Sequence, residues 1–389
     1  MSSIHLVRGV VKHYDWGGHH FLPAILNSED TQKPYAEYWM GTHPQGISQL
    51  ENVDGSIFSL KDKISNLSFL LKVLDVRDML SIQVHPTKSA AKIEFERENK
   101  EGIDLSAPTR NYKDDNHKPE LMVALSSFWL LHGFKVERQL KETLKSVSEF
   151  SSLLPVWESG GNEALYKYVM NLSQQESDQL LLPLLERLSS QYQKGALPKS
   201  SPDFWAARAG EMYCKNGHAD RGIFSIYFFN LVHLNPGEAV FQNAGIPHAY
   251  LEGQNVEIMA NSDNVLRGGL TYKHVDVPEL MKHTRCEGII PQRLLPQKKD
   301  EPVQWFETPV TDFRLGVLSL EGGLKKELQK QQPCFLLSLS GTVELISGGT
   351  QLTLKQGQIA AFWDGSVPLT ISSLSKAVVY VATSGIHTS

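Results

Sequence analysis

The residues at 80–86, LSIQVHP, combine apolar side chains with side chains that can bind a ligand. If this stretch is a β-strand, alternate side chains project to opposite faces. One face then carries the apolar residues Ile82, Val84 and Pro86. The other carries a hydroxyl, an amide and an imidazole in a row, from Ser81, Gln83 and His85. Such a polar row on a short apolar strand is typical of a surface that faces a ligand.

Two further segments carry groups that bind metals. The sequence NHKPE ends in Glu120, which directly precedes the apolar run LMVAL and would open a strand. The sequence GIPHAY places His248 behind a proline corner, at the start of another strand. The imidazoles of His85 and His248, the carboxylate of Glu120 and the amide oxygen of Gln83 form a nitrogen and oxygen ligand set. Such a set suits a metal ion with a position open for a substrate.

Each of these residues also has a structural interpretation when it is taken singly. His85 would be a hydrogen-bonded core residue, and Gln83 a strand amide satisfied by a neighbour. Glu120 would pair with Lys118, and His248 would cap a turn. The metal site is therefore favoured only by the four residues together.

The chain divides by composition into strand-like and helical parts. Residues 1–135 are strand-like, apart from a polar passage at 94–116 that reads as a long loop. Residues 136–224 repeat apolar side chains at helical spacing, which predicts an α-helical insert. Strand character returns over 225–300 and continues through 301–389.

An internal repeat indicates two related lobes. LNPGEAVFQNAGIPHAY, which starts at Leu234, resembles LKQGQIAAFWDGSVPLTI, which starts at Leu354. Both read as a strand, a glycine turn, a buried strand and a proline corner, as in antiparallel jelly-roll barrels. The first copy has His248 at the corner and the second has Leu369. We therefore expect a metal-binding lobe from 1–135 and 225–300, and a lobe without metal over 301–389.

Composition narrows the class of protein. The chain has 389 residues, of which 41% are hydrophobic and 21% charged, as in globular proteins. Its three cysteines are far apart, which argues against a disulfide framework. The net charge of -5 gives no reason to expect a nucleic-acid partner. No apolar run suits a membrane span or a signal peptide, so we expect a cytoplasmic protein, monomeric or, as the alternative, dimeric.

With their flanks, these residues resemble the type I mannose-6-phosphate isomerase family of the cupin superfamily. The resemblance covers nearly the whole chain, in the family's order, through FLLKVLDV, LSIQVHP, NYKDDNHKPEL, LNPGEAVF, GIPHAYLEG and VEIMANSDNVLRGGLTYKHVD. HYDWG and YAEYWMGTHPQG also fit. It implies a mainly β fold of two cupin-type jelly-roll lobes with an inserted α-helical domain. It also implies one Zn²⁺ per chain, with the ligands Gln83, His85, Glu120 and His248.

The activity that the resemblance implies is the interconversion of D-mannose 6-phosphate and D-fructose 6-phosphate through a cis-enediol. A proton leaves C2 and arrives at C1, so one group must act as a base at neutral pH. We expect this group to be Glu257, because apolar neighbours on its strand would raise its pKa by desolvation. Lys118 and Asp263 are further acid or base groups.

Recognition of the phosphate requires fixed donors. The family implies Lys72, Ser81, Arg267 and Lys273 for this role, of which Arg267 is favoured because Gly268 and Gly269 follow it. As the alternative, Lys72 would be a lysine at the end of a strand that extends its charge to solvent. Lys273 would be a solvent-exposed charge on a loop. The remaining residues expected at the pocket wall are Tyr250, Asp15 and Trp16, with an ordinary core position as the alternative for Trp16.

Two other functions fit a metal site on such a fold. Another cupin metalloenzyme, such as an Fe(II) oxygenase, would use two histidines and one carboxylate. The fourth ligand, Gln83, and the basic cluster weigh against it. A non-catalytic sugar-phosphate-binding protein is the other alternative, and the presence of Glu257 weighs against that.

Overall fold

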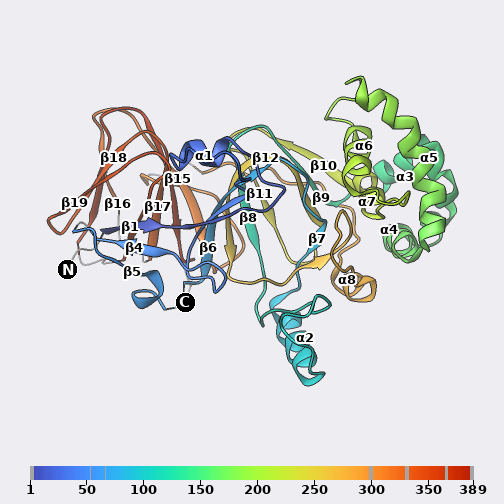
Figure 1. The fold of residues 1–389 in the computed structure, drawn as a ribbon, viewed down its shortest axis with the longest axis horizontal. Helices are drawn as coiled ribbons and strands as arrows, with labels where there is room; N and C mark the ends of the chain where they lie inside the picture. Colours follow the sequence, from blue (N-terminus) through green and yellow to red (C-terminus); the bar gives the residue numbers. More distant parts are fainter. Residues whose placement is uncertain are drawn as a thin grey trace.

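The structure, a computed structural model, describes residues 4–52, 54–65, 67–297, 301–328, 333–363 and 367–385. Strands fill the body of the molecule and most helices gather at one end (Figure 1). The pairs of named strands in these residues are antiparallel. The prediction of a mainly β protein is confirmed. No helix among these residues is long and apolar enough to cross a membrane.

A ten-stranded sheet carries the residues predicted to form the site, and its central strand is β12 (His248–Ala260). β12 pairs with β7 and β9 over its first residues and with β6 and β8 over its second half. The other strands are β2 (Val10–Lys12), β3 (Glu37–Met40), β6 (Phe69–Val76), β7 (Gln83–Val84), β8 (Glu120–Ala124), β9 (Phe128–Phe134), β10 (Phe229–Leu234), β11 (Ala239–Gln242) and β13 (Leu266–Arg267).

Alternation along β6 and β12 gives this sheet two distinct faces. On one face, Val73 and Ile258 belong to an apolar core that also contains Phe335 from the C-terminal part of the chain. On the other face, Lys72 lies directly opposite Glu257. We call this second face, which carries Lys72 and Glu257, the inner face.

A shift in strand pairing keeps both ends of β12 on the inner face. His248 and Glu257 are nine residues apart, so regular alternation would direct them to opposite faces. Between Tyr250 and Glu252, however, the pairing of β12 with β9 shifts by one residue. Gly253 follows with a φ of 128°, which side chains rarely adopt. β12 is thus one strand with a β-bulge.

The C-terminal part of the chain forms two further sheets that enclose an apolar cluster, in which Leu369 is fully buried. The N-terminal strands β1, β4 and β5 join the larger of these sheets. That sheet contains β14 (Gln304–Trp305), β15 (Arg314–Leu320), β22 (Ala377–Thr383), β17 (Cys334–Ser340), β20 (Ile359–Phe362), β1 (Ile4–Arg8), β4 (Gln49–Glu51) and β5 (Ile57–Ser59). The smaller contains β16 (Lys325–Leu328), β21 (Leu369–Ser372), β18 (Val343–Ser347) and β19 (Thr350–Leu354).

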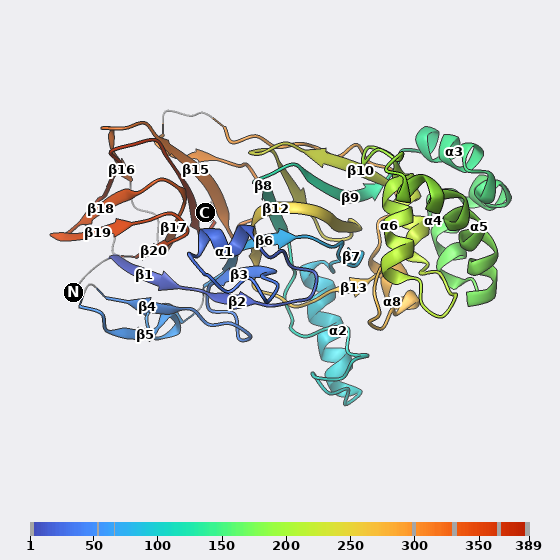
Figure 2. The same cartoon turned by 45° about the horizontal axis from the view of Figure 1, so that its top comes forward.

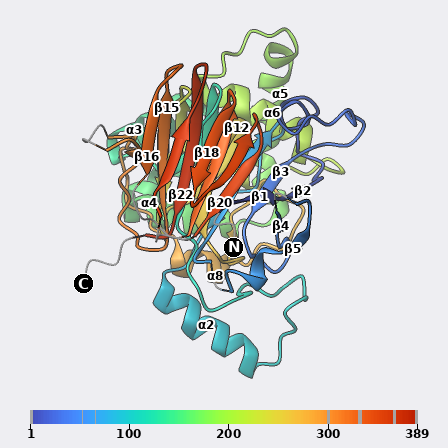
Figure 3. The same ribbon diagram turned by 90° about the vertical axis from the view of Figure 1, so that its left-hand side faces the viewer.

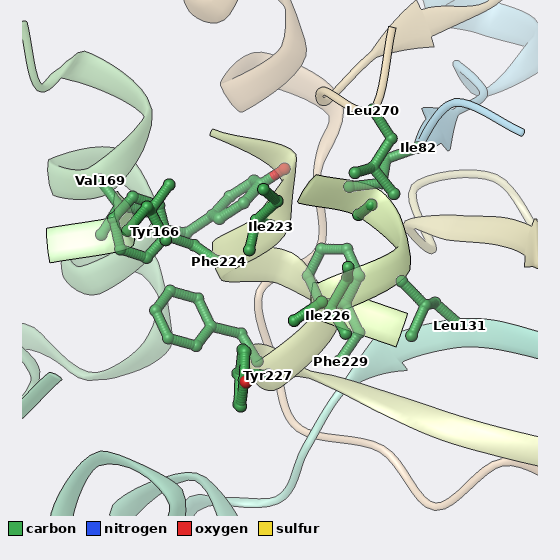
Figure 4. Packing of buried hydrophobic residues seen from close by; sticks show 14 of the residues in the cluster. Ile82, Leu131, Tyr166, Val169, Ile223, Phe224, Ile226, Tyr227, Phe229 and Leu270 are labelled. Carbon is green, nitrogen blue, oxygen red and sulfur yellow. The ribbon is translucent and has the colours of Figure 1, made fainter. Parts of the chain in front are cut away.

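The helices that follow β9 gather at the far end of the ten-stranded sheet (Figure 2). They are α3 (Glu137–Ser146), α4 (Leu154–Asn171), α5 (Gln174–Gln193), α6 (Pro202–Tyr213) and α7 (Gly222–Phe228), with the short helices η2 (Ser148–Leu153) and, later, α8 (Val277–His283). Every residue of α7 is buried. Figure 4 shows why: its side chains pack between Tyr166 and Val169 of α4 on one side and Leu131 of β9 and Ile82, just before β7, on the other.

The stretch LSIQVHP is a strand only over Gln83–Val84, so the predicted strand was too long. The flanking backbone is nevertheless hydrogen-bonded, since the amide of Ile82 donates to Gly269 and the carbonyl of His85 accepts from Gly245. These bonds go to loops, which is why the strand ends early. The predicted apolar face is correct, because Ile82 and Val84 belong to the core shared with the helices.

The prediction of a loop over 94–116 was wrong in its first part, because α2 (Lys88–Lys100) extends into it. α2 stands apart from the body of the molecule (Figure 3). The helix was missed because it buries polar rather than apolar side chains. Glu94 pairs with Arg97 at 2.6 Å, and Glu98 pairs with Arg110 at 2.8 Å. The remaining short helices are α1 (Phe21–Ile25) and η1 (Leu60–Asp62).

Gly253→Ala should lower the free energy of unfolding by more than Gly237→Ala. Both glycines have positive φ, at 128° and 89°, which costs a residue with a side chain about 1–2 kcal/mol. A Cβ at Gly237 would meet nothing within 4 Å, whereas a Cβ at Gly253 would lie 2.8 Å from the carbonyl oxygen of Ser127. Urea unfolding of both variants checks this, and equal losses would mean that the β9 backbone yields freely.

Candidate metal centre and active site

Three of the four predicted metal ligands meet on the inner face. The Nε2 atom of His85 lies 3.5 Å from Glu120 Oε1, and the Nε2 atom of His248 lies 3.4 Å from Glu120 Oε2. Ligand atoms from all three residues lie within 4.8 Å of one another, and all three residues are buried. The loop before β8 and the proline corner before β12 bring them together from distant parts of the sequence.

Hydrogen bonds orient both imidazoles for metal binding. His85 Nδ1 lies 2.8 Å from the carbonyl oxygen of Asn264, and His248 Nδ1 lies 3.0 Å from that of Ile246. A carbonyl only accepts, so Nδ1 carries the proton and Nε2 keeps its lone pair. Burial lowers the pKa of His85 to about 4, which keeps this ring neutral. Its Nε2 is buried without a hydrogen-bond partner, as expected for a ligand atom, so the residues fit a metal ion.

The register of three strands places Gln83 and Arg267 beside His248. Gln83 is directly opposite His248 across β7 and β12, and directly opposite Arg267 across β7 and β13. Directly opposite residues in antiparallel strands project to the same side, with Cβ atoms about 5 Å apart. The fourth predicted ligand and the favoured phosphate donor therefore share a side with His248.

Lys118 lies against the candidate metal centre. Its Nζ is 3.1 Å from Glu120 Oε1, so the pairing considered as the structural alternative does exist. Burial alone would raise the pKa of Glu120, but the charge of Lys118 beside it holds that pKa well below its usual range. Glu120 is therefore an anion, as a metal ligand must be.

A buried chain of charged groups lies next to this cluster. Lys72 Nζ is 3.1 Å from Glu257 Oε1 and 3.6 Å from Glu37 Oε2. The hydroxyl of Tyr250 donates to the other oxygen of Glu257 at 2.8 Å. The Trp39 indole donates to Glu37. Both oxygens of Glu257 are thus held by donors from the inner face.

Within this buried row of charged groups, the surroundings make the Glu257 carboxylate more basic and keep the Lys72 ammonium charged. Burial raises the pKa of Glu257, and Lys72 opposes this only in part. Burial would lower the pKa of Lys72, but the carboxylates of Glu37 and Glu257 outweigh it and raise the pKa above its ordinary value. The predicted desolvation of Glu257 is confirmed in direction.

Asp263 belongs to a group that the sequence did not reveal. Its Oδ1 lies 3.4 Å from His43 Nε2, and its Oδ2 accepts from the Gln45 amide at 2.9 Å. Burial would raise the pKa of Asp263, but the His43 hydrogen bond lowers it below its ordinary value. Glu37, His43 and Gln45 appear in the sequence only within the family-like segment YAEYWMGTHPQG, and none of them was predicted to belong to the site. A usable signal was that Glu37 and Trp39 are two residues apart on one strand, so that their polar groups project to the same face.

The other predicted residues lie further out. Lys273 is exposed for much of its surface, and its partial burial and then the charge of Arg267 lower its pKa below the ordinary value. Ser81 is half-buried beside the start of β7. Trp16 is half-buried against an apolar cluster that includes Tyr250. Asp15 is exposed, and its backbone carbonyl accepts from Arg77 at 2.6 Å.

The comparisons with known proteins agree with one another. Residues 4–137 match the family model for the phosphomannose isomerase type I catalytic domain. The mannose-6-phosphate isomerase of Escherichia coli is 35% identical over 383 residues, which cover 93% of this chain and 95% of that protein. The human mannose-6-phosphate isomerase is 33% identical and covers 90% of each chain.

The chain belongs to the type I mannose-6-phosphate isomerase family. The resemblance drawn from its motifs is confirmed. Its fold also matches solved members of the family over nearly the whole chain. The Salmonella typhimurium enzyme bound to its substrate and to a zinc atom superposes with a TM-score of 0.88 at 32% identity, covering 99% of this chain and 100% of that chain. A zinc-bound mannose 6-phosphate isomerase superposes with a TM-score of 0.87 at 31% identity.

Lys72→Met should lower the free energy of unfolding by about 3–5 kcal/mol, because it leaves Glu257 and Glu37 buried without their cation. The loss should grow as pH rises. Without Lys72, Glu257 keeps its proton to a higher pH when folded than when unfolded, so the folded state binds more protons above about pH 4.3.

Urea unfolding at pH 5 and pH 8 measures both effects. As a control, Glu257→Gln in the Lys72→Met background should restore part of the stability at pH 8. A loss that is independent of pH would contradict this account of the buried chain.

Proposed function

We propose that the chain interconverts D-mannose 6-phosphate and D-fructose 6-phosphate as a zinc-dependent aldose–ketose isomerase. The observation that carries this is the buried cluster of His85, Glu120 and His248 in a member of this family. We propose Gln83 as the fourth ligand, since its register places it beside His248. One Zn²⁺ per chain is expected.

The ligand set suits the charge that develops in the reaction. Removal of a proton from C2 leaves negative charge on the neighbouring oxygen, which must be stabilised. Zinc held by three neutral ligands and one carboxylate would supply a formal charge of about +1 for this purpose. The hydrogen bonds from His85 and His248 to backbone carbonyls keep both rings in the geometry that the ion requires.

We propose Glu257 as the group that carries the proton. Its carboxylate takes the proton from C2 of mannose 6-phosphate and returns it to C1, while the hydroxyl proton of O2 moves to O1, so that C2 becomes a ketone and C1 carries a hydroxyl group. Lys72 and Tyr250 each bond one of its oxygens, so the side chain is held in one orientation. Its raised pKa brings it nearer to the pH at which a base must both accept and release a proton.

The residues around this group receive supporting roles. For the phosphate we propose Arg267, with Ser81 and Lys273, because Arg267 shares a side with the ligands and can bind two oxygens at once. Lys72 is already paired with two carboxylates, which favours a role in holding Glu257 over one in binding phosphate.

We propose Lys118 and Asp263 as acid and base groups for opening the sugar ring. Lys118 lies within reach of the metal centre, and Asp263 is oriented by His43 and Gln45. Tyr250 and Trp16 would line the pocket, since they share an apolar cluster. Asp15 is exposed and would lie at its rim.

We also propose a division into domains. Residues 1–135 and 225–300 would form a metal-binding cupin barrel, 136–224 an inserted helical domain, and 301–389 a cupin-like lobe without metal. The buried Leu369 at the corner where the first lobe has His248 supports this. The strands β1, β4 and β5 cross from the first lobe into the sheet of the second.

The alternatives are weaker. An Fe(II) oxygenase does not account for the buried Glu257–Lys72–Tyr250 group, and a non-catalytic sugar-phosphate-binding protein does not need it. The partner that we expect is a small sugar phosphate. The cytoplasmic location and the monomeric state, with a dimer as the alternative, remain predictions from the sequence.

Metal removal should abolish turnover, and zinc should restore it. His85→Ala and His248→Ala should lose zinc and activity together, because each removes one of only four ligands. His233→Ala is the control, since His233 lies on β10 and contacts Ser127. Elemental analysis with an assay of fructose 6-phosphate formation tests this. Full activity of metal-free protein, or a second zinc bound within 301–389, would contradict the proposal.

Glu257→Gln should lower kcat by roughly two to four powers of ten while zinc and substrate remain bound, because it removes only the basic carboxylate. Deuterium at C2 of mannose 6-phosphate should then no longer exchange with solvent or reach C1. Glu252→Gln, on the same strand in an ion pair with Arg208, is the matched control. If Glu257→Gln keeps near wild-type turnover, the base must be sought at Lys118 or Asp263.

A further inference from the structure

A second polar pair lies beside the metal centre on the inner face. His132 of β9 is directly opposite His248, and Gln242 of β11 is directly opposite Glu120. Directly opposite residues of antiparallel strands project to the same side. Both side chains therefore share a side with the metal ligands, and they are only 5% and 0% exposed. Neither residue was singled out from the sequence.

One hydrogen bond orients the pair. His132 Nδ1 lies 2.7 Å from the amide oxygen of Gln242. An amide oxygen only accepts, so the imidazole donates and fixes which way the Gln242 amide points. The amide nitrogen of Gln242 is then directed away from the ring. It is buried, and it has no hydrogen-bond partner among the described residues.

An unpaired buried amide is unfavourable by about 1–3 kcal/mol, and such groups in folded proteins usually have a reason. His85 Nε2 is also buried without a partner. The two atoms differ in kind. His85 Nε2 offers a lone pair, which a metal ion satisfies. Gln242 Nε2 offers only N–H groups, which need an acceptor oxygen and which no metal can satisfy.

We propose that Gln242 and His132 form a hydroxyl-binding subsite of the pocket. Gln242 Nε2 donates a hydrogen bond to a hydroxyl oxygen of the bound sugar. His132 is a positioning residue that acts through the Gln242 amide. This rests on the proposed function, because it requires a sugar phosphate in the pocket.

The chemistry of the pair favours a neutral hydroxyl over the phosphate. The Gln242 amide is the group that would meet the ligand, and it carries no charge. The cations of the site lie elsewhere, on Arg267, Lys118 and Lys72. A buried donor aimed at one hydroxyl discriminates strongly against sugars that lack it, because it is then left unpaired. The pair would therefore act on substrate specificity.

Gln242→Met tests the subsite, because methionine has a similar length and volume but no amide. We expect KM for mannose 6-phosphate and the Kd of D-mannitol 6-phosphate, which cannot isomerise, to rise about 3- to 10-fold, as for one neutral hydrogen bond. Binding of inorganic phosphate and zinc content should stay unchanged. Ser347→Ala, which removes a buried unpartnered hydroxyl from the C-terminal lobe, is the control and should change none of the binding constants.

His132→Leu, like Gln242→Met, should weaken the binding of mannitol 6-phosphate. Adding it to Gln242→Met should cause no further loss, because His132 acts through Gln242. If Gln242→Met does not fold, Gln242→Glu keeps the bond from His132 and removes the N–H donors, and it should weaken binding likewise.

Unchanged binding of mannitol 6-phosphate, or its loss in step with zinc, would overturn the subsite. Failure of the proposed function is a separate result, since the unmodified protein would then neither isomerise mannose 6-phosphate nor bind its analogue.

Discussion

The β-bulge in β12 is the constraint on which the site depends. A single strand supplies His248 to the metal centre and Glu257 to the buried chain of charges, although their spacing would direct them to opposite faces of a regular strand. The shift in pairing beside Gly253 reverses the alternation and directs both inward. Four partner strands then fix the position of β12. A metal ligand and a base can thus be held by one rigid element, where their separation does not depend on a mobile loop.

Charge compensation is the second principle of the site. The inner face buries the carboxylates of Glu120 and Glu257 and half-buries that of Glu37, each of which would be unstable alone in an apolar interior. Lys72 lies between Glu37 and Glu257, and Lys118 contacts Glu120. The same pairs that make burial tolerable also set the chemistry: Glu120 stays ionised as a ligand must, whereas the pKa of Glu257 is raised toward that of a useful base.

Much of the site could be predicted from the sequence where a local strand pattern contained a side chain that can bind a metal. His85, Glu120 and His248 were found because each stands at the start of a strand or beside one, next to apolar runs. Features that depend on distant contacts were not found. α2 buries Glu98 against Arg110 and so lacks an apolar stripe. The bulge near Gly253 is set by its approach to β9. The pairing of His132 with Gln242 joins residues 110 apart in the sequence, and neither has a signal of its own.

The exchange of strands between the two halves of the chain has a consequence for how the protein is made. β1 is hydrogen-bonded between β4 and β20, so its partner on one side consists of residues 359–362. During synthesis on the ribosome, β1 emerges first and must wait for nearly the whole polypeptide before that edge is covered. An uncovered edge is a template for unwanted pairing with another chain. Vectorial folding, in which the first half is finished before the second appears, is thus incomplete here, because that edge of β1 stays uncovered until residues 359–362 have been made.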